Sequence, residues 1–313
     1  MAITNQTHDT DFIIVGFSEL PQLKSLLFGT FLLIYLGTLV GNLLIILVVF
    51  WNTSLHTPMY FFLSNLSLVD VTSTFVTFPK MLISLIREGS PISLVECILQ
   101  LYCVLCMLAT EFNLLTVMGY DRYIAICNPL RYTVIMSKST CTKLAVSSWI
   151  CGLLEPILHT VLLSGLSFCK SHHINHFFCD MTALLKLSCT KTNTIETVTY
   201  ILGTFLVMGT FLLIVTSYVK ILAAILKINS TEGRRKAFST CASHLSVVVL
   251  FYAAILVMYM RPSTMYSQNQ DKILSLLYIV ITPLFNPIIY SMKNAEFKKA
   301  LQRARFADRS NHK

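Results

Sequence analysis

Charged residues are scarce in this sequence. Asp, Glu, Lys and Arg together make up 12% of its 313 residues, whereas 55% of the residues are hydrophobic. A soluble globular domain carries roughly 25% charged residues, so this chain has too little polar surface to face water on all sides. The scarcity argues against a soluble fold and indicates that lipid surrounds much of the chain.

The sequence also lacks the motifs of common enzymes. It contains no Gly-x-Ser-x-Gly nucleophile elbow, no His-Glu-x-x-His zinc motif and no phosphate-binding loop. We therefore expect that the protein is not an enzyme. We also expect it to have no catalytic residue and no bound metal.

Long hydrophobic runs, in contrast, are abundant. A helix needs about 20 apolar residues to cross the hydrocarbon core of a bilayer, which is roughly 30 Å thick. Seven such runs occur, at approximately residues 25–51, 58–79, 97–119, 144–169, 197–219, 242–260 and 273–292. The connections between them are short. This pattern predicts an all-α membrane protein with a seven-transmembrane helix bundle at 25–292, in a single domain that covers 1–313.

Lys and Arg are concentrated on one side of this predicted bundle. With residues 1–24 outside the cell, the inner segments hold 16 of the 24 basic residues but only four of the 15 acidic ones. Cytoplasmic segments of membrane proteins carry an excess of Lys and Arg, so we expect an extracellular N-terminus and a cytoplasmic tail at 293–313. The net charge of +9 thus follows from topology, and we expect no nucleic-acid partner.

The N-terminal segment shows no cleavable signal peptide. Residues 1–23 are mostly polar and lack a basic stretch before a short apolar one, so we expect the first span to act as its own signal anchor. Asn5 begins an Asn-x-Thr sequon on the predicted outer side. We therefore expect Asn5 to be glycosylated.

Four of the ten cysteines lie at or beyond the predicted outer boundary of the spans. They are Cys97, Cys169, Cys179 and Cys189. An even number of cysteines in an oxidising compartment predicts two disulfides. The residues by themselves leave three pairings open.

Three histidines, His172, His173 and His176, stand in the outer loop between Cys169 and Cys179. A zinc or copper site is one interpretation of this spacing. We favour a solvated loop whose cysteines are bridged, because a metal requires deprotonated ligands that converge on one point.

Acidic residues inside the predicted spans are candidates for function, because a charge at the bilayer centre costs roughly 2.5–3.5 kcal/mol. Asp70 and Glu111 lie deep in the second and third spans. They can share a proton, bind a small cation or join the helices through hydrogen bonds. Glu155 precedes Pro156 in the fourth span, where it either faces a ligand cavity or packs against a neighbouring helix.

Two further motifs indicate moving parts. The pair Asp121-Arg122 stands where the third span meets a basic loop, and such a pair can hold a helix end in one state and release it in another. Near the end of the seventh span, Asn286 and Pro287 predict a kink, because proline removes a backbone hydrogen bond. One interpretation is that Tyr290, which follows this kink, swings between two positions. The alternative is that the kink is static.

Basic residues continue beyond the spans. Arg234, Arg235 and Lys236 run into the sixth span, where they can meet anionic lipid or a partner protein. After the seventh span, apolar and basic residues alternate, which predicts a short amphipathic helix on the membrane surface. Its members are Phe297, Lys298, Lys299, Leu301, Arg303, Arg305 and Phe306.

Short motifs are distributed, in order, over essentially the whole chain. They are Gly41-Asn42, Leu55-His56-Thr57-Pro58-Met59-Tyr60 continuing to Asp70, Asp121-Arg122-Tyr123 continuing to Tyr132, Ser217-Tyr218, Lys236-Ala237-Phe238 continuing to Leu245, and Pro283-Leu284-Phe285-Asn286-Pro287 continuing to Ser291. Together they resemble the rhodopsin-like G-protein-coupled receptors, and within that family the tetrapod-type class of olfactory receptors. The sequence departs from most rhodopsin-like receptors at Tyr252, where these have Trp, so the toggle role of that Trp transfers only loosely.

The resemblance implies an odorant receptor. Such a receptor binds small, volatile, mostly apolar molecules and activates a heterotrimeric stimulatory G protein of the olfactory type, which raises cyclic AMP. Its partners would be the odorant, the G protein and the lipid bilayer, and its place the plasma membrane of olfactory sensory cilia. A receptor of the same fold in another tissue is an alternative. A transporter is a further alternative. It would show paired broken spans in two halves, a symmetry that seven spans with one strongly proline-marked helix do not give.

The resemblance also assigns roles to single residues. Arg122 would meet the G protein when the sixth span moves outward, and Asp121 would restrain it at rest. Asp70 and Glu111 would form a buried polar site that can hold a structural sodium ion, the one candidate cofactor. The remaining switch residues would be Tyr123, Tyr218, Asn286, Pro287 and Tyr290.

For the disulfides, the resemblance implies the pairs Cys97–Cys179 and Cys169–Cys189, with Cys97–Cys189 as an alternative. For the ligand, it implies a pocket among the third, fifth and sixth spans, lined by Val104, Leu105, Leu108, Ala109, Leu202, Leu206, Tyr252, Ile255 and Tyr259. Such an apolar lining, with tyrosine hydroxyls as polar groups, binds by shape and dispersion. The stretch 104–109 contains no carboxylate, which disfavours an amine ligand.

Overall fold

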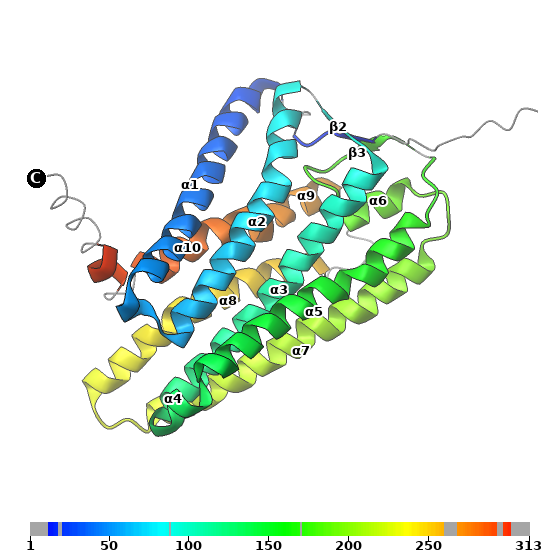
Figure 1. Cartoon of the computed structure of the whole chain (residues 1–313). Coiled ribbons are helices and arrows are strands. Elements are labelled where there is room, and N and C mark those ends of the chain that lie inside the picture. The colour runs from blue at the N-terminus through cyan, green and yellow to red at the C-terminus, as the bar shows by residue number, and fades with distance from the viewer. Residues whose placement is uncertain are drawn as a thin grey trace, which may run out of the picture.

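The chain folds into a bundle of long helices (Figure 1), seen in a computed structural model that describes residues 12–17, 21–87, 89–169, 171–259, 268–292 and 297–301. The first six long helices are α1 (Lys24–Trp51), α2 (Pro58–Arg87), α3 (Leu94–Cys127), α5 (Lys138–Ser164), α7 (Asn193–Leu226) and α8 (Thr231–Tyr259). The seventh is built from α9 (Gln268–Leu276), the π-helical segment η5 (Leu277–Ile281) and α10 (Thr282–Met292). The predicted all-α seven-helix class is confirmed.

Shorter elements lie at the two ends of the bundle. They are β1 (Phe12–Ile14), η1 (Pro21–Leu23), η2 (Thr53–Leu55), β2 (Ser90–Ile92), η3 (Pro129–Arg131), α4 (Tyr132–Ile135), β3 (His173–Ile174) and α6 (Met181–Leu187). The three strands and α6 lie at one end, which we call the disulfide end. Arg122 lies near the other, which we call the Arg122 end.

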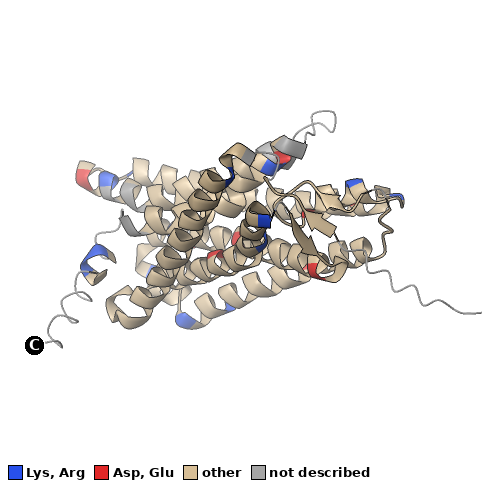
Figure 2. Ribbon diagram, turned by 90° about the horizontal axis from the view of Figure 1, so that it is seen from above, with Lys and Arg blue, Asp and Glu red and all other residues tan. Residues whose placement is uncertain are grey.

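Several of these helices have the length and composition of membrane spans. In the described part of the chain, six helices are long and apolar enough to cross a membrane, and α8 contributes a shorter apolar stretch, Cys241–Leu256. Figure 2 shows Lys and Arg mainly toward the ends of the helices. The protein is therefore a multi-pass membrane protein.

Most of the long helices extend beyond the spans predicted from hydropathy, and for two of them the local reason is clear. α2 continues past Pro79 to Arg87, since a helix in lipid keeps its remaining hydrogen bonds across a proline. α3 begins at Leu94 rather than at 97 because Ser93 caps it. The Ser93 hydroxyl accepts the backbone N–H of Glu96 at 3.2 Å, and the Glu96 carboxylate accepts the backbone N–H of Ser93 at 3.2 Å.

A small three-stranded sheet covers the disulfide end. Its order is β2-β1-β3, with β1 antiparallel to β2 and parallel to β3. Gly89, just before β2, has a φ of +144°. A Cβ at this position would lie 2.7 Å from Cγ2 of Ile13 in β1. Only glycine suits both the backbone angle and the close approach of the strand.

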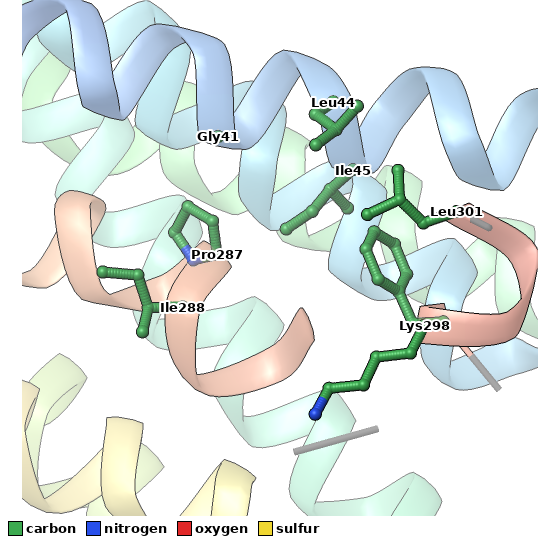
Figure 3. A pocket seen from close by; sticks show the side chains of 8 residues that line it. Gly41, Leu44, Ile45, Pro287, Ile288, Lys298 and Leu301 are labelled. Atoms are coloured by element: carbon green, nitrogen blue, oxygen red, sulfur yellow. The ribbon is translucent and has the colours of Figure 1, made fainter. Parts of the chain in front are cut away.

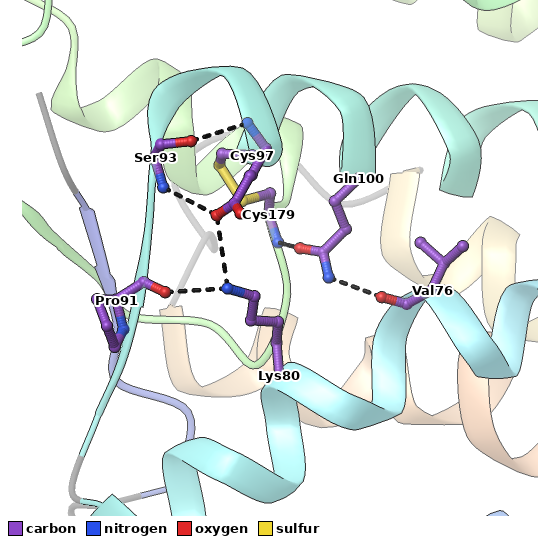
Figure 4. Close-up of a disulfide and its surroundings, with 8 residues drawn as sticks. Val76, Lys80, Pro91, Ser93, Cys97, Gln100 and Cys179 are labelled. Atoms are coloured by element: carbon purple, nitrogen blue, oxygen red, sulfur yellow. Dashed lines mark hydrogen bonds and ion pairs between the residues drawn. A yellow bond between two sulfur atoms is a disulfide. The ribbon is translucent and has the colours of Figure 1, made fainter. Parts of the chain in front are cut away.

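The start of α3 is fixed to its surroundings by a disulfide and by Gln100. Cys97 is joined to Cys179, one of the pairings that the resemblance implies. One turn further along α3, the Gln100 side chain accepts the backbone N–H of Cys179 at 2.9 Å and donates to the carbonyl of Val76 at 2.8 Å (Figure 4). These contacts join α2, α3 and the loop before α6.

Two glycines permit close contact between helices. A Cβ at Gly152 of α5 would overlap the hydroxyl of Thr110 on α3 and would lie 3.0 Å from the carbonyl oxygen of Cys106. A Cβ at Gly41 of α1 would lie 3.1 Å from the ring of Pro287 on α10, and Figure 3 shows Gly41 and Pro287 facing each other. Both helix pairs approach as closely as backbone atoms allow.

Candidate functional site

A large cavity lies toward the disulfide end of the bundle. It has a volume of about 1030 Å³ and is bounded by α3, α5, α6, α7 and α8. Five of the nine residues that the resemblance places in a ligand pocket line it, namely Leu105, Leu108, Ala109, Leu206 and Ile255. Hydrophobic side chains supply most of the lining, as is typical of small-molecule sites.

The cavity-facing side of α3 follows a helical stripe. Leu105, Leu108, Ala109 and Phe112 line the cavity and are spaced as one face of a helix. Extending this spacing by one turn would have found Phe112 from the sequence. Val104 lies off the stripe and is 5% exposed within the helix core, so it is not part of the lining.

Tyr252 lies below the cavity rather than in its wall. Its hydroxyl donates to the Thr210 hydroxyl at 2.8 Å. Its ring lies 5.3 Å from that of Phe112 and 5.4 Å from that of Phe211. Since Phe112 lines the cavity, Tyr252 is connected to the site through this one ring.

Two other pocket residues also differ from expectation. Leu202 does not line the cavity, because α7 turns Thr199, Gly203 and Leu206 toward it. The side chain of Tyr259 lies outside the described residues.

One wall of the cavity comes from α6, which the hydrophobic runs did not predict. This helix lies inside the loop closed by the Cys169–Cys189 disulfide, the second pairing that the resemblance implies. Asp180 caps it by accepting the backbone N–H groups of Thr182 and Ala183 at 2.9 and 3.1 Å. An Asp before a short apolar run is a helix-start signal. The α6 residues that line the cavity are Met181, Thr182, Leu185 and Lys186.

Glu155 and His159, one turn apart on α5, also line the cavity. The structure thus decides between the two interpretations that the sequence left open for Glu155. His159 Nδ1 lies 3.3 Å from the Glu155 carbonyl oxygen and 4.0 Å from its carboxylate Oε1. Together they bring an imidazole and a carboxylate to an otherwise largely apolar wall.

A second polar centre lies deeper between α2, α3 and α10. Asp70 and Glu111 are 1% and 5% exposed, and they interact electrostatically with each other. Asn286 donates to Asp70 Oδ2 at 2.9 Å. Among the described residues, no hydrogen-bond partner is found for Asp70 Oδ1, Glu111 Oε1 or Asn286 Oδ1. Such oxygens can hold a shared proton or a small cation.

Asp121 and Arg122 form an ion pair near the Arg122 end of α3. Arg122 Nη2 lies 2.6 Å from Asp121 Oδ2, and Arg122 Nε donates to the same oxygen at 3.1 Å. The Tyr132 hydroxyl donates to Asp121 Oδ1 at 2.8 Å. The carboxylate is fully buried, so both of its oxygens are satisfied within the protein.

Tyr218 of α7 is bonded to α8 rather than to Arg122. Its hydroxyl lies 2.7 Å from His244 Nδ1, and His244 Nε2 lies 3.0 Å from the Leu115 carbonyl oxygen of α3. His244 therefore links three helices, a role that the sequence motif around it did not reveal. Tyr123 contacts Lys220 of α7, whose Nζ lies 5.3 Å from the centre of the Tyr123 ring.

The remaining switch residues lie around α10. Tyr290 is 5% exposed, and its hydroxyl has no hydrogen-bond partner among the described residues. Pro287 borders a groove of about 280 Å³ between α1, α10 and residues 297–301 (Figure 3). Phe297 and Leu301 line this groove and Lys298 borders it. Phe306, Arg303 and Arg305 lie outside the described residues.

The histidines of the loop before α6 do not converge. His172 and His173 are exposed, whereas His176 is buried between the rings of Phe177 and Phe178, at 4.7 and 4.5 Å. Burial lowers the pKa of His176 to about 4. Within the described ranges, no cluster of three His, Cys, Asp or Glu residues could hold a metal ion. Asn5 lies outside the described residues.

Comparisons with known proteins agree in pointing to one family. A family model described as olfactory receptor matches residues 31–307. The human olfactory receptor 2A5 is 46% identical over 98% of this chain and 99% of its own length. The gorilla olfactory receptor 1G1 and the mouse olfactory receptor 2A7 are each 48% identical over 96% of both chains.

Proposed function

The chain belongs to the olfactory receptor family, and we propose that it binds a small, volatile, mostly apolar odorant in the cavity at the disulfide end and activates a stimulatory G protein of the olfactory type. It is a signalling receptor rather than an enzyme. Activation of the G protein raises cyclic AMP, and the receptor acts in the plasma membrane of olfactory sensory cilia.

The observation that carries this proposal is the cavity itself. Its volume of about 1030 Å³ is at the upper end of the range for small-molecule sites, roughly 300–1,000 Å³. Its walls are largely apolar, which suits a ligand that partitions from air into lipid. Binding there is dominated by shape and dispersion, with few polar contacts to fix the orientation.

Two independent features support the proposed orientation in the membrane. Disulfides form in oxidising compartments, which supports an extracellular position for Cys97, Cys179 and the cavity. The excess of Lys and Arg on the opposite connections supports a cytoplasmic position for the Arg122 end. The N-terminus is then extracellular, and Asn5 is available for glycosylation.

Signal transmission requires contacts that differ between two states of the bundle. The ligand meets Phe112, and this ring packs against Phe251 and Tyr252 of α8 at 4.8 and 5.3 Å. At the Arg122 end, the ion pair with Asp121 holds the guanidinium at rest. A ligand that binds more tightly to the state with α8 displaced shifts the population toward it, and Arg122 then becomes available to the G protein.

The deeper polar centre fits a sodium ion. The unpartnered oxygens of Asp70, Glu111 and Asn286 are the hard ligands that such a cation takes. A bound sodium ion would neutralise part of the negative charge at this centre. Asp70 and Glu111 join α2 to α3, and Asn286 extends the contact to α10, so this centre favours the resting arrangement of the three helices.

The test is a cyclic-AMP reporter in cells that express this chain together with the olfactory G protein. A broad panel of volatile compounds should contain agonists that raise cyclic AMP in a dose-dependent manner. Surface expression is measured in parallel with an antibody against an N-terminal tag. Silence to the whole panel in cells with proven surface expression contradicts the proposed function.

A further inference from the structure

We propose that the cavity selects odorants that carry a hydroxyl group, held between the Glu155 carboxylate and the His159 imidazole of α5. The inference rests on the proposed function, in that the cavity takes a small, mostly apolar molecule. It adds the chemical class of that molecule, an alcohol or phenol. It also assigns the fourth long helix a direct role in recognition.

The position of the two side chains gives them access to a ligand. Glu155 and His159 stand one turn apart on α5, and both line the cavity. The Glu155 side chain is 21% exposed and the His159 side chain 4% exposed. Leu105 and Leu108 of the neighbouring helix α3 add apolar side chains to the lining, so a hydrogen bond formed there faces less competition from water.

The local geometry determines which atoms remain available. His159 Nδ1 lies 3.3 Å from the Glu155 carbonyl oxygen. A carbonyl can only accept, so Nδ1 carries the hydrogen and Nε2 is left for the cavity. No hydrogen-bond partner within the described ranges occupies His159 Nε2, and none donates to the Glu155 carboxylate. Two strong polar groups therefore reach the cavity with unused hydrogen-bonding capacity.

The other charged residues of the lining are already engaged. Lys186 lies 3.8 Å from the carboxylate of Asp271 on α9. Glu196 accepts a hydrogen bond from the Thr192 hydroxyl at 2.5 Å, next to the start of α7. The first contact joins α6 to α9, and the second lies within the start of α7. The Glu155–His159 pair differs from them, because among the described residues no group bonds to His159 Nε2 or donates to the Glu155 carboxylate.

A hydroxyl group fits this pair better than other polar groups of odorants do. Its O–H donates to the Glu155 carboxylate, which can only accept, and the same hydroxyl can bond to His159 Nε2. The oxygen of an ether, ester or ketone only accepts, so it leaves the buried carboxylate without a donor. A site built to bond a hydroxyl rejects the analogue that lacks it.

The proposal is tested by ligand binding to the full chain, purified in lipid nanodiscs. The probes are octanol, cyclohexylmethanol and phenylethanol, each compared with its methyl ether and with the amine of the same skeleton. Binding is read as the rise in Tm with probe concentration. For at least one skeleton, the alcohol should bind roughly tenfold or more tightly than its ether and than the amine.

Variants of the pair identify its role in this preference. Glu155→Ala and His159→Ala should reduce the alcohol-to-ether ratio to near one, whereas Glu155→Gln, which keeps an acceptor oxygen, should retain part of it. Ser147→Ala is the matched control, because Ser147 is an exposed residue of the same helix and is not among the cavity-lining residues. Each variant is first compared with the wild type in Tm without ligand, which separates a folding defect from a loss of selectivity.

Three results overturn the proposal. In the first, the ethers bind as tightly as their alcohols. In the second, the amines bind more tightly than the alcohols of the same skeleton. In the third, the preference for the alcohol over the ether survives in both Glu155→Gln and Glu155→Ala. The binding measurement does not involve the G protein, so it is distinguishable from the cyclic-AMP test. Ethers that bind and signal as well as alcohols would leave the proposed function intact and remove the hydroxyl preference.

Discussion

The Asn286 side-chain amide on α10 donates a 2.9 Å hydrogen bond to Asp70 Oδ2 on α2. Both residues are almost completely buried. Because α10 follows the π-helical segment η5 and carries Pro287, its backbone has an irregular start and a proline inside. The side-chain bond therefore helps to fix the position of α10 against α2.

Asn286→Ala should lower stability by about 1–3 kcal/mol, because it leaves a buried carboxylate oxygen without its donor. The measurement is thermal unfolding of the purified receptor. The double variant Asp70→Ala/Asn286→Ala should lose less than the sum of the two single variants. Strictly additive losses would show that the two side chains do not interact.

Arg122→Ala should abolish the cyclic-AMP response while surface expression stays near that of the wild type. The guanidinium is the group that we expect to meet the G protein, and after its removal the Tyr132 hydroxyl still donates to the Asp121 carboxylate. Flow cytometry of surface receptor and the reporter assay are made on the same cells. A normal response from this variant would remove Arg122 from the coupling site.

Tyr132→Phe should raise signalling in the absence of ligand. The hydroxyl of Tyr132 donates to Asp121 Oδ1 at 2.8 Å. Its loss weakens the resting arrangement by about 1 kcal/mol. The ratio of active to resting receptor then rises roughly fivefold. Basal cyclic AMP per surface receptor is the readout. Tyr120→Phe, two residues before Arg122 at an exposed position of α3, is the control and should leave the basal level unchanged.

Gly152→Ala should impair folding and surface delivery. The added Cβ would overlap the Thr110 hydroxyl and would lie 2.9 Å from the Thr110 backbone nitrogen, which forces α5 away from α3. Such overpacking costs about 1–3 kcal/mol. Gly29→Ala is the matched control, because no atom lies within 4 Å of a Cβ built there. Equal surface levels for the two variants would contradict the close contact between the helices.

His176 should make stability depend on pH in mildly acidic conditions. Burial lowers the pKa of His176 to about 4, whereas an unfolded histidine has a pKa of about 6.5. Between these values the unfolded chain binds more protons, so stability is complete above pH 6.5 and falls by about 3 kcal/mol as the pH approaches 4.

The charged groups that act on His176 are Asp180 in its own loop and Asp271 and Lys272 on α9. Unfolding of the purified receptor, followed from neutral to acidic pH, measures the dependence. His176→Phe should flatten it, because the ring stays apolar at every pH. His173→Gln, on an exposed strand position, should leave it unchanged. A slope that persists in His176→Phe would assign the effect to another group.

Hydrophobic runs and local motifs were enough to predict the seven long helices. The length of each run depends only on the thickness of the bilayer. The capping signal of Ser93 with Glu96 also requires only neighbouring residues, but the hydropathy runs did not use it and placed the start of this span at 97. The pair Asp121-Arg122 was likewise recognisable, because adjacent residues form the contact. The partner of Asp121 in η3–α4, Tyr132, lies close enough in the chain to belong to the same motif.

The rotation of each helix about its axis was harder to predict. Lipid and the protein interior are both apolar, so hydrophobicity does not distinguish the outward side of a span from the inward side. The pocket residues therefore come from the resemblance, which includes Val104 and Leu202 but not the cavity-lining Phe112 and His159. The direction of Glu155 depends on how α5 packs against α3 through Gly152, which only the assembled bundle determines.

The Cys169–Cys189 disulfide closes a ring that contains α6, and α6 forms one wall of the cavity. The buried residues Ala183, Leu184 and Leu187 of α6 pack in one hydrophobic cluster with Leu101 of α3 and Leu163 of α5. A covalent bond, a helix cap and this packing therefore hold the wall together. The same helix contributes Thr182 and Lys186 to the cavity lining. One short helix thus serves both to anchor the ring on the bundle and to form part of the cavity surface.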